Sequence, residues 1–171
     1  TLYGDATHYP VPGGPRQIFA VDIDGDGKKD LLVAGSDSIS YLASHGDGTF
    51  AAAKTIATQA TSIQVGDFDE NGIVDIAAFG FRATSPSRPA LGVLLGGAGG
   101  AFAAVKLYPY DSTAEVSEFS VGDMDGDGHL DMLLPGSISA SGITWMGLGD
   151  GSFGPATAFP AIPGNARLTD L

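Results

Sequence analysis

Aspartate, asparagine and glycine recur in this chain in three nine-residue segments, here called cassettes, whose spacing suits a hard divalent cation. The cassettes span residues 22–30, 67–75 and 123–131. Each has oxygen-bearing side chains at cassette positions 1, 3, 5 and 9, and glycine at position 6. Calcium takes six to eight oxygens at about 2.3–2.6 Å, so alternate residues of a tight turn can surround one ion. The cassettes therefore predict three cation sites.

The predicted ligands are the side chains of positions 1, 3, 5 and 9 and the backbone carbonyl of position 7. Glycine at position 6 allows the bend that turns this carbonyl toward the ion. The expected cofactor is Ca²⁺, with about three ions per chain. The ligand sets are Asp22, Asp24, Asp26, Lys28 and Asp30; Asp67, Asp69, Asn71, Ile73 and Asp75; and Asp123, Asp125, Asp127, His129 and Asp131.

Two other interpretations apply to the same residues. An EF-hand needs flanking helices and a glutamate at position 12, where this chain has Val33, Ala78 and Leu134. An acidic turn without an ion is the second interpretation, since Asp and Gly are ordinary turn residues. Three copies in one register favour the cation, because it relieves repulsion among crowded carboxylates. Asn71 lowers the ligand charge of the second cassette, which predicts the weakest site unless Glu70 compensates.

Short, mainly apolar segments flank every cassette and predict β-strands. Runs of this length bounded by glycine are typical of buried strands. They lie at 18–21 and 31–34, at 63–65 and 76–79, and at 119–121 and 132–134. Each cassette is therefore expected to join the two strands of a hairpin.

A second repeated unit follows each cassette. An apolar stretch leads into a glycine-rich turn that ends in phenylalanine, at 39–50, 91–102 and 143–153. Asp-Gly between apolar segments is a strong hairpin signal, and the aromatic residue is expected to open the return strand. The cassettes begin at residues 22, 67 and 123, so the repeat intervals are 45 and 56 residues. Four short strands in a repeat of this size are typical of a β-propeller blade.

The repeats resemble the FG-GAP/VCBS repeat, the unit of calcium-loop propellers in integrin α-subunit heads and in many secreted microbial proteins. Residues 65–72 and 121–128 match its core motif, and residues 46–50 match its distal turn. The resemblance covers essentially the whole chain. It implies an all-β propeller fold, calcium at the cassettes and an extracellular, secreted location.

The chain is expected to form one propeller segment over residues 1–171. Complete blades are predicted at about 16–60, 61–112 and 116–162, with partial blades at 1–15 and 163–171. A propeller typically has four to eight blades. The remaining blades are therefore expected from further sequence of a longer protein or from self-association, most simply as a two-fold pair.

Composition narrows the function classes. The net charge of −12 disfavours nucleic acid and anionic membranes as partners, because phosphate binding needs a basic face. No apolar stretch reaches the roughly 18 residues of a membrane span, so no membrane insertion is expected. The chain has no Cys, and His8, His45 and His129 lack ligand or triad spacing. No nucleophile elbow or phosphate loop appears either, so the segment is expected not to be an enzyme.

Residues 81–90 form the one conspicuous insertion and carry two of the eight basic residues. Insertions in repeat proteins map to loops, often on the binding face. This loop is therefore the predicted contact for a protein or glycan ligand, and a tolerated surface insertion is the alternative. Trp145 is predicted to lie in the core rather than to serve as a sugar platform.

Together these features predict a noncatalytic, calcium-binding module for extracellular binding or cell adhesion. Two alternatives stay open. One is a carbohydrate-binding propeller lectin, because some propellers of the resembling type bind sugars between blades. The other is an accessory propeller of a secreted enzyme whose chemistry lies in other sequence.

Overall fold

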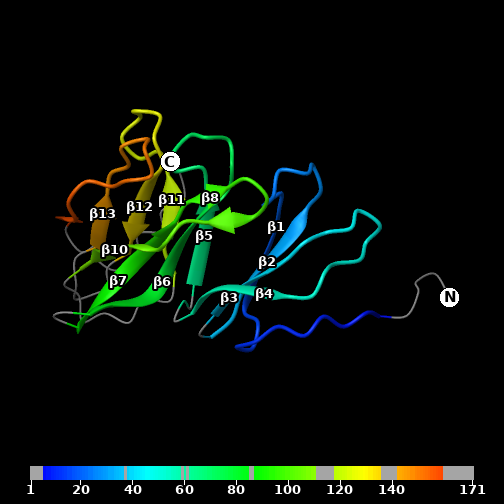
Figure 1. Cartoon of the computed structure of the whole chain (residues 1–171). Coiled ribbons are helices and arrows are strands. Elements are labelled where there is room, and N and C mark those ends of the chain that lie inside the picture. Colours follow the sequence, from blue (N-terminus) through cyan, green and yellow to red (C-terminus); the bar gives the residue numbers. More distant parts are fainter. Residues whose placement is uncertain are drawn as a thin grey trace, which may run out of the picture.

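A computed structural model of the chain describes residues 6–36, 38–58, 60, 62–84, 87–110, 118–135 and 142–159. Across these residues the secondary structure is entirely β, without a helix. The strands form three antiparallel four-stranded sheets and one small two-stranded sheet. Figure 1 shows the three large sheets next to one another. The predicted all-β fold of separate four-stranded sheets is confirmed, and it is consistent with part of a β-propeller.

Each large sheet follows the chain from strand to strand. The first sheet has the order β1 (Gln17–Val21), β2 (Asp30–Ala34), β3 (Ser38–Leu42) and β4 (Lys54–Thr58). The second has β5 (Ser62–Gly66), β6 (Asp75–Thr84), β7 (Ser87–Leu94) and β10 (Lys106–Pro109). The third has β11 (Ser120–Gly122), β12 (Asp131–Leu134), β13 (Gly142–Trp145) and β14 (Thr157–Phe159). The two-stranded sheet pairs β8 (Gly96–Gly97) with β9 (Ala101–Phe102).

Every cassette is the loop of a hairpin between the first and second strands of its sheet, as predicted. The last pair before the loop is Val21↔Asp30 in the first sheet, Gly66↔Asp75 in the second and Gly122↔Asp131 in the third. Position 9 of the cassette is therefore the first residue of the second strand. All three cassettes lie at the same end of the sheets, at the top of Figure 1.

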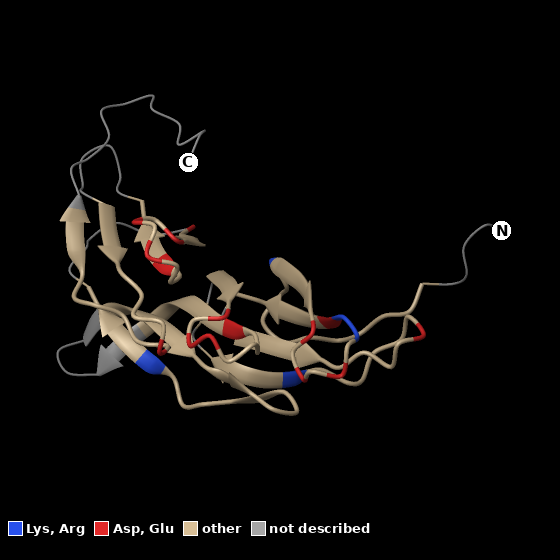
Figure 2. Ribbon diagram, turned by 90° about the horizontal axis from the view of Figure 1, so that it is seen from above, with Lys and Arg blue, Asp and Glu red and all other residues tan. Residues whose placement is uncertain are grey.

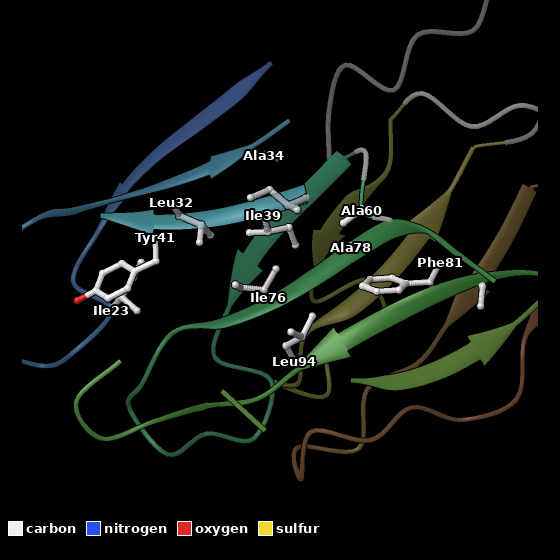
Figure 3. Packing of buried hydrophobic residues seen from close by; sticks show 12 residues of the cluster. Ile23, Leu32, Ala34, Ile39, Tyr41, Ala60, Ile76, Ala78, Phe81 and Leu94 are labelled. Atoms are coloured by element: carbon white, nitrogen blue, oxygen red, sulfur yellow. The ribbon is translucent and has the colours of Figure 1, made fainter. Parts of the chain in front are cut away.

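The central sheet is buried on both faces, because its side chains alternate between two hydrophobic cores. Ile76 and Ala78 of β6 lie in the core shared with the first sheet. Ala77 and Phe79 lie in the core shared with the third sheet. Successive strand residues point to opposite faces, so a continuous apolar run fits a doubly covered strand. Figure 3 shows the first core, between β3 and β6.

Trp145 belongs to the second core, which confirms the prediction made for it. Its side chain is only 2 % exposed. The ring packs edge-on against Tyr110, with 5.9 Å between ring centroids. Such edge-to-face aromatic contacts add to the stabilisation from burial alone.

The glycine-rich turns differ from the prediction in where the return strand begins. Phe50 and Phe153 form isolated bridges with Ser44 and Gly147, and Phe102 lies in the short strand β9. The fourth strands begin only at positions 54, 106 and 157. The phenylalanine therefore closes the turn and does not open the return strand. The reason is local: the amide of the next residue donates back across the turn, from Ala51 to Ala43, Ala103 to Leu95 and Gly154 to Met146.

Residues 81–90 are largely strand, so the prediction of a loop over this range is wrong. Residues 81–84 extend β6 and residues 87–90 extend β7, paired from Phe81↔Ala90 to Thr84↔Ser87 after a register shift. Phe81 is buried, and an ideal Cβ on Gly92 would lie 2.4 Å from its ring. The glycine of β7 thus leaves room for the aromatic side chain that anchors the extension.

The predicted partial blades fall mostly outside the described residues. Residues 1–5 and 163–171 are not described, and residues 6–15 form no strand. The blade boundaries given above stay a prediction.

Candidate metal centres

The three cassettes each gather carboxylate oxygens within 4.8 Å of one another. Nine of the predicted side-chain ligands form these clusters, which contain oxygen donors only. The groups are Asp22, Asp24 and Asp30; Asp67, Asp69 and Asp75; and Asp123, Asp125 and Asp127. Figure 2, seen from the cassette end, shows acidic residues concentrated in these loops. Oxygen clusters of this kind match the donor preference of calcium.

The aspartate at position 1 shapes its own loop by accepting two backbone N–H groups. In the first cassette Asp22 accepts from Gly25 at 2.8 Å and from Gly27 at 2.9 Å. Asp123 accepts in the same way from Gly126 and Gly128. Asp67 accepts from Asn71 and Gly72. Its first donor is therefore at cassette position 5, whereas the first donor in the other two cassettes is at position 4. These bonds hold the loop as a ring around the carboxylate.

Position 4 has the same backbone conformation in all three cassettes although its residue differs in the second, a feature that the ligand spacing did not predict. Position 4 has a left-handed φ in all three loops: +80° at Gly25, +57° at Glu70 and +82° at Gly126. Glycine adopts this conformation easily, whereas glutamate does so rarely. Glycine at position 4 of two cassettes was the available signal. Position 6 is also left-handed, which agrees with the argument from its glycines.

Positions 3, 5 and 7 are linked by short turns. The amide of position 7 donates to the side chain of position 5, from Lys28 to Asp26 at 2.9 Å and from Ile73 to Asn71 at 2.7 Å. His129 donates to Asp127 at 2.8 Å in the same way. These bonds fix the backbone of position 7 at the exit of the loop. Ligation through its carbonyl stays a prediction.

The side chains of position 5 distinguish the first two cassettes. In the first, Nζ of Lys28 lies 2.6 Å from Oδ2 of Asp26. This hydrogen bond lowers the pKa of Asp26 and raises the pKa of Lys28. In the second, Nδ2 of Asn71 donates to Oδ2 of Asp69 at 3.0 Å. Each contact occupies an oxygen that was predicted to face an ion.

Position 9 is different from the rest of the loop because it is fully buried. Asp30, Asp75 and Asp131 are each 0 % exposed. Burial raises the pKa of Asp75, and the amides of Gly96 and Phe68 oppose this by donating to its carboxylate. The carboxylates of position 9 therefore accept hydrogen bonds from backbone N–H groups of the protein.

Glycine-rich turns of neighbouring sheets also reach the cassettes. The amide of Gly99 donates to the carbonyl of Asp24 at 3.3 Å. The amide of Gly151 donates to the carbonyl of Phe68 at 2.8 Å. Within the first sheet, the hydroxyl of Tyr41 donates to Oδ2 of Asp24 at 3.1 Å. The first and second cassettes are thus contacted by the turn of the following sheet.

Comparison with protein families matches residues 8–78 to the FG-GAP-like repeat. This segment contains the first two cassettes, and its match supports the resemblance to FG-GAP repeats that the sequence predicted. No curated protein matches the chain. Within the described residues, no helix has the length and apolar character needed to cross a membrane.

Proposed function

We propose that this chain is a calcium-binding, noncatalytic module that serves binding or adhesion outside the cell. The observation that carries the proposal is the threefold repetition of one oxygen-lined loop at the same end of three sheets. A cluster of carboxylates is costly without a counterion, because like charges repel at short range. A hard cation in each loop removes that cost.

Calcium fits the donor set better than a transition metal does. The predicted ligands offer carboxylate, amide and carbonyl oxygens, and the chain has no Cys. Oxygen ligands suit calcium and magnesium, whereas zinc and copper favour nitrogen and sulfur. Three Ca²⁺ would change the formal charge from −12 to −6. Sites of this class can be as weak as about 10⁻⁴–10⁻³ M, which suits calcium-rich extracellular fluid.

The binding role has two parts. The ligand is a protein or a glycan that contacts the β6–β7 ribbon near residues 81–90, because insertions in repeat proteins often form the recognition face. The propeller is completed by further blades or by a second copy of the chain, since the described residues form three four-stranded sheets and a propeller typically has four to eight blades. A glycan array separates a lectin from a protein adhesin.

Calorimetric titration of the chain in millimolar calcium tests the metal proposal. We expect three ions per chain, and fewer than two would overturn it. Melting in the same buffer gives a second readout, because an ion that binds only the folded state stabilises by about 2.7 kcal/mol per site at a hundredfold excess over Kd. Magnesium at equal ionic strength is the control for nonspecific screening.

A further inference from the structure

We propose that Asp30, Asp75 and Asp131 are buried clamps that hold each cassette against the glycine-rich turn of its own sheet before any ion arrives. The starting observation is their complete burial, at 0 % exposure in all three sheets. A carboxylate is rarely buried unless it is paired or hydrogen-bonded, because desolvation penalises its charge. The hydrogen-bond donors to each buried carboxylate therefore indicate its structural role.

The first partner is the amide at position 2 of the same cassette. Oδ2 of the clamp accepts an N–H from Ile23 at 3.0 Å, from Phe68 at 2.7 Å and from Met124 at 2.8 Å. Seven residues separate donor and acceptor in each case. This bond closes the base of the loop, just below the residues predicted to surround the ion.

The second partner is the amide that begins the glycine-rich turn. Oδ1 of the clamp accepts an N–H from Ser44 at 2.8 Å, from Gly96 at 2.6 Å and from Gly147 at 2.8 Å. The same three residues pair with the phenylalanine that closes each turn. One carboxylate thus joins the cassette to the turn.

The link continues into the next sheet at Phe68. Its N–H donates to Asp75, and its carbonyl accepts from Gly151 of the third sheet. The backbone of this one residue therefore carries both the clamp and the contact between sheets. Hydrogen bonds to a charged acceptor are about twice as strong as neutral ones, so these bonds suit a structural joint.

Replacing an aspartate by asparagine should have different effects where the side chain only binds an ion and where it acts as a clamp. At position 9, an Asn side chain would present an NH₂ group to a buried backbone N–H, and a buried donor would lose its acceptor. At position 1, Asp123 also accepts two backbone N–H groups, but it is exposed and water can replace it. D131N and D123N are therefore a matched pair that differs in burial.

The test is amide hydrogen exchange of the full chain in calcium chelator, followed at Met124 and Gly147. We expect both amides of the unmodified chain to exchange at least about a hundredfold more slowly than in an unfolded peptide. D131N should lose this protection at the amide that its NH₂ group faces, whereas D123N should keep it at both amides. D131N should also lower Tm by about the same amount in calcium and in chelator.

The proposal does not depend on calcium binding, because the deciding measurement is made without the ion. Free exchange of Met124 and Gly147 in the unmodified chain in chelator would overturn it. Protection retained at both amides in D131N, or a Tm loss confined to calcium, would overturn it equally. If D131N does not fold, the exchange of the unmodified chain decides. Failure of the calcium titration alone would leave the clamp intact.

Discussion

Nδ1 of His129 lies 2.5 Å from Oε1 of Glu70, so a side chain of the third cassette meets one from the second. The hydrogen bond that His129 makes to the Glu70 carboxylate raises the pKa of His129. Gly149 completes the contact, since an ideal Cβ there would lie 2.5 Å from the imidazole ring. Glu70 was the residue expected to supplement the second cassette if Asn71 weakened it. One of its oxygens is instead bound to His129.

Loss of either side chain of this pair should loosen the contact between the second and third sheets. Glu70→Gln and His129→Gln should each give a small decrease in Tm in chelator at pH 6, because exposed ion pairs contribute little. The Tm of the double variant should be no lower than the Tm of the less stable single variant. Additive losses in this double-mutant cycle would show that the two side chains do not interact.

Asn71→Asp should have opposite effects with and without calcium. The Asn71 amide now donates to Asp69, and a carboxylate in its place would repel that neighbour. We therefore expect a lower Tm in chelator and a roughly tenfold tighter second site in calcium titrations, because affinity follows ligand charge. Equal shifts of Tm in both media would contradict an ion at this cassette.

Lys28→Met should strengthen calcium binding at the first cassette by about two- to fivefold, since it frees Oδ2 of Asp26. Lys29→Met is the matched control, because it removes the same charge from the neighbouring exposed residue. Site-resolved titration by NMR compares the two variants. A similar gain in both would mean that total charge, and not the Lys28 contact, limits the site.

Spacing alone predicted much of this arrangement, and the exceptions have physical causes. Asp22, Asp24 and Asp30 fall in one cluster because alternation in a tight turn directs them inward. The role of Asp30 as a partner of Ser44 depends on a contact 14 residues away, which no local pattern encodes. Residues 81–84 and 87–90 are strand, and Phe81 packs over Gly92 there, a long-range contact that composition did not reveal. The left-handed φ of Glu70 is set by its surroundings in the fold.

Gly147→Ala should destabilise the third sheet by about 1–3 kcal/mol, as is typical of overpacking. An ideal Cβ at Gly147 would lie 2.3 Å from the backbone oxygen of Leu130, which cannot move without disturbing the cassette. Gly122→Ala is the control, because nothing lies within 4 Å of its Cβ position. Chemical denaturation of both variants in chelator gives the comparison. Equal stability of the two would contradict the close approach.

Asp150 should titrate below its ordinary range because the hydroxyl of Ser152 donates to it, which lowers the pKa of Asp150 from 3.8. A lowered pKa in the folded state means that this contribution to stability is present above the unfolded pKa and is lost as pH falls through the folded value. In Ser152→Ala the carboxyl pKa, followed by NMR from pH 2 to 6, should rise toward 3.8. An unchanged titration would exclude the hydroxyl as the cause.

Gly151 contacts Phe68, and Gly99 contacts Asp24, so two of the cassettes are hydrogen-bonded to a turn of the following sheet. The structural unit that includes a cassette and this turn therefore extends beyond one sequence repeat. A segment cut from first strand to fourth strand would leave its cassette without the turn that contacts it from the following sheet. Protein engineers who wish to exchange or add a repeat should therefore place the second junction after the glycine-rich turn of the next sheet. Chimeras joined there keep each loop and its covering turn from the same parent.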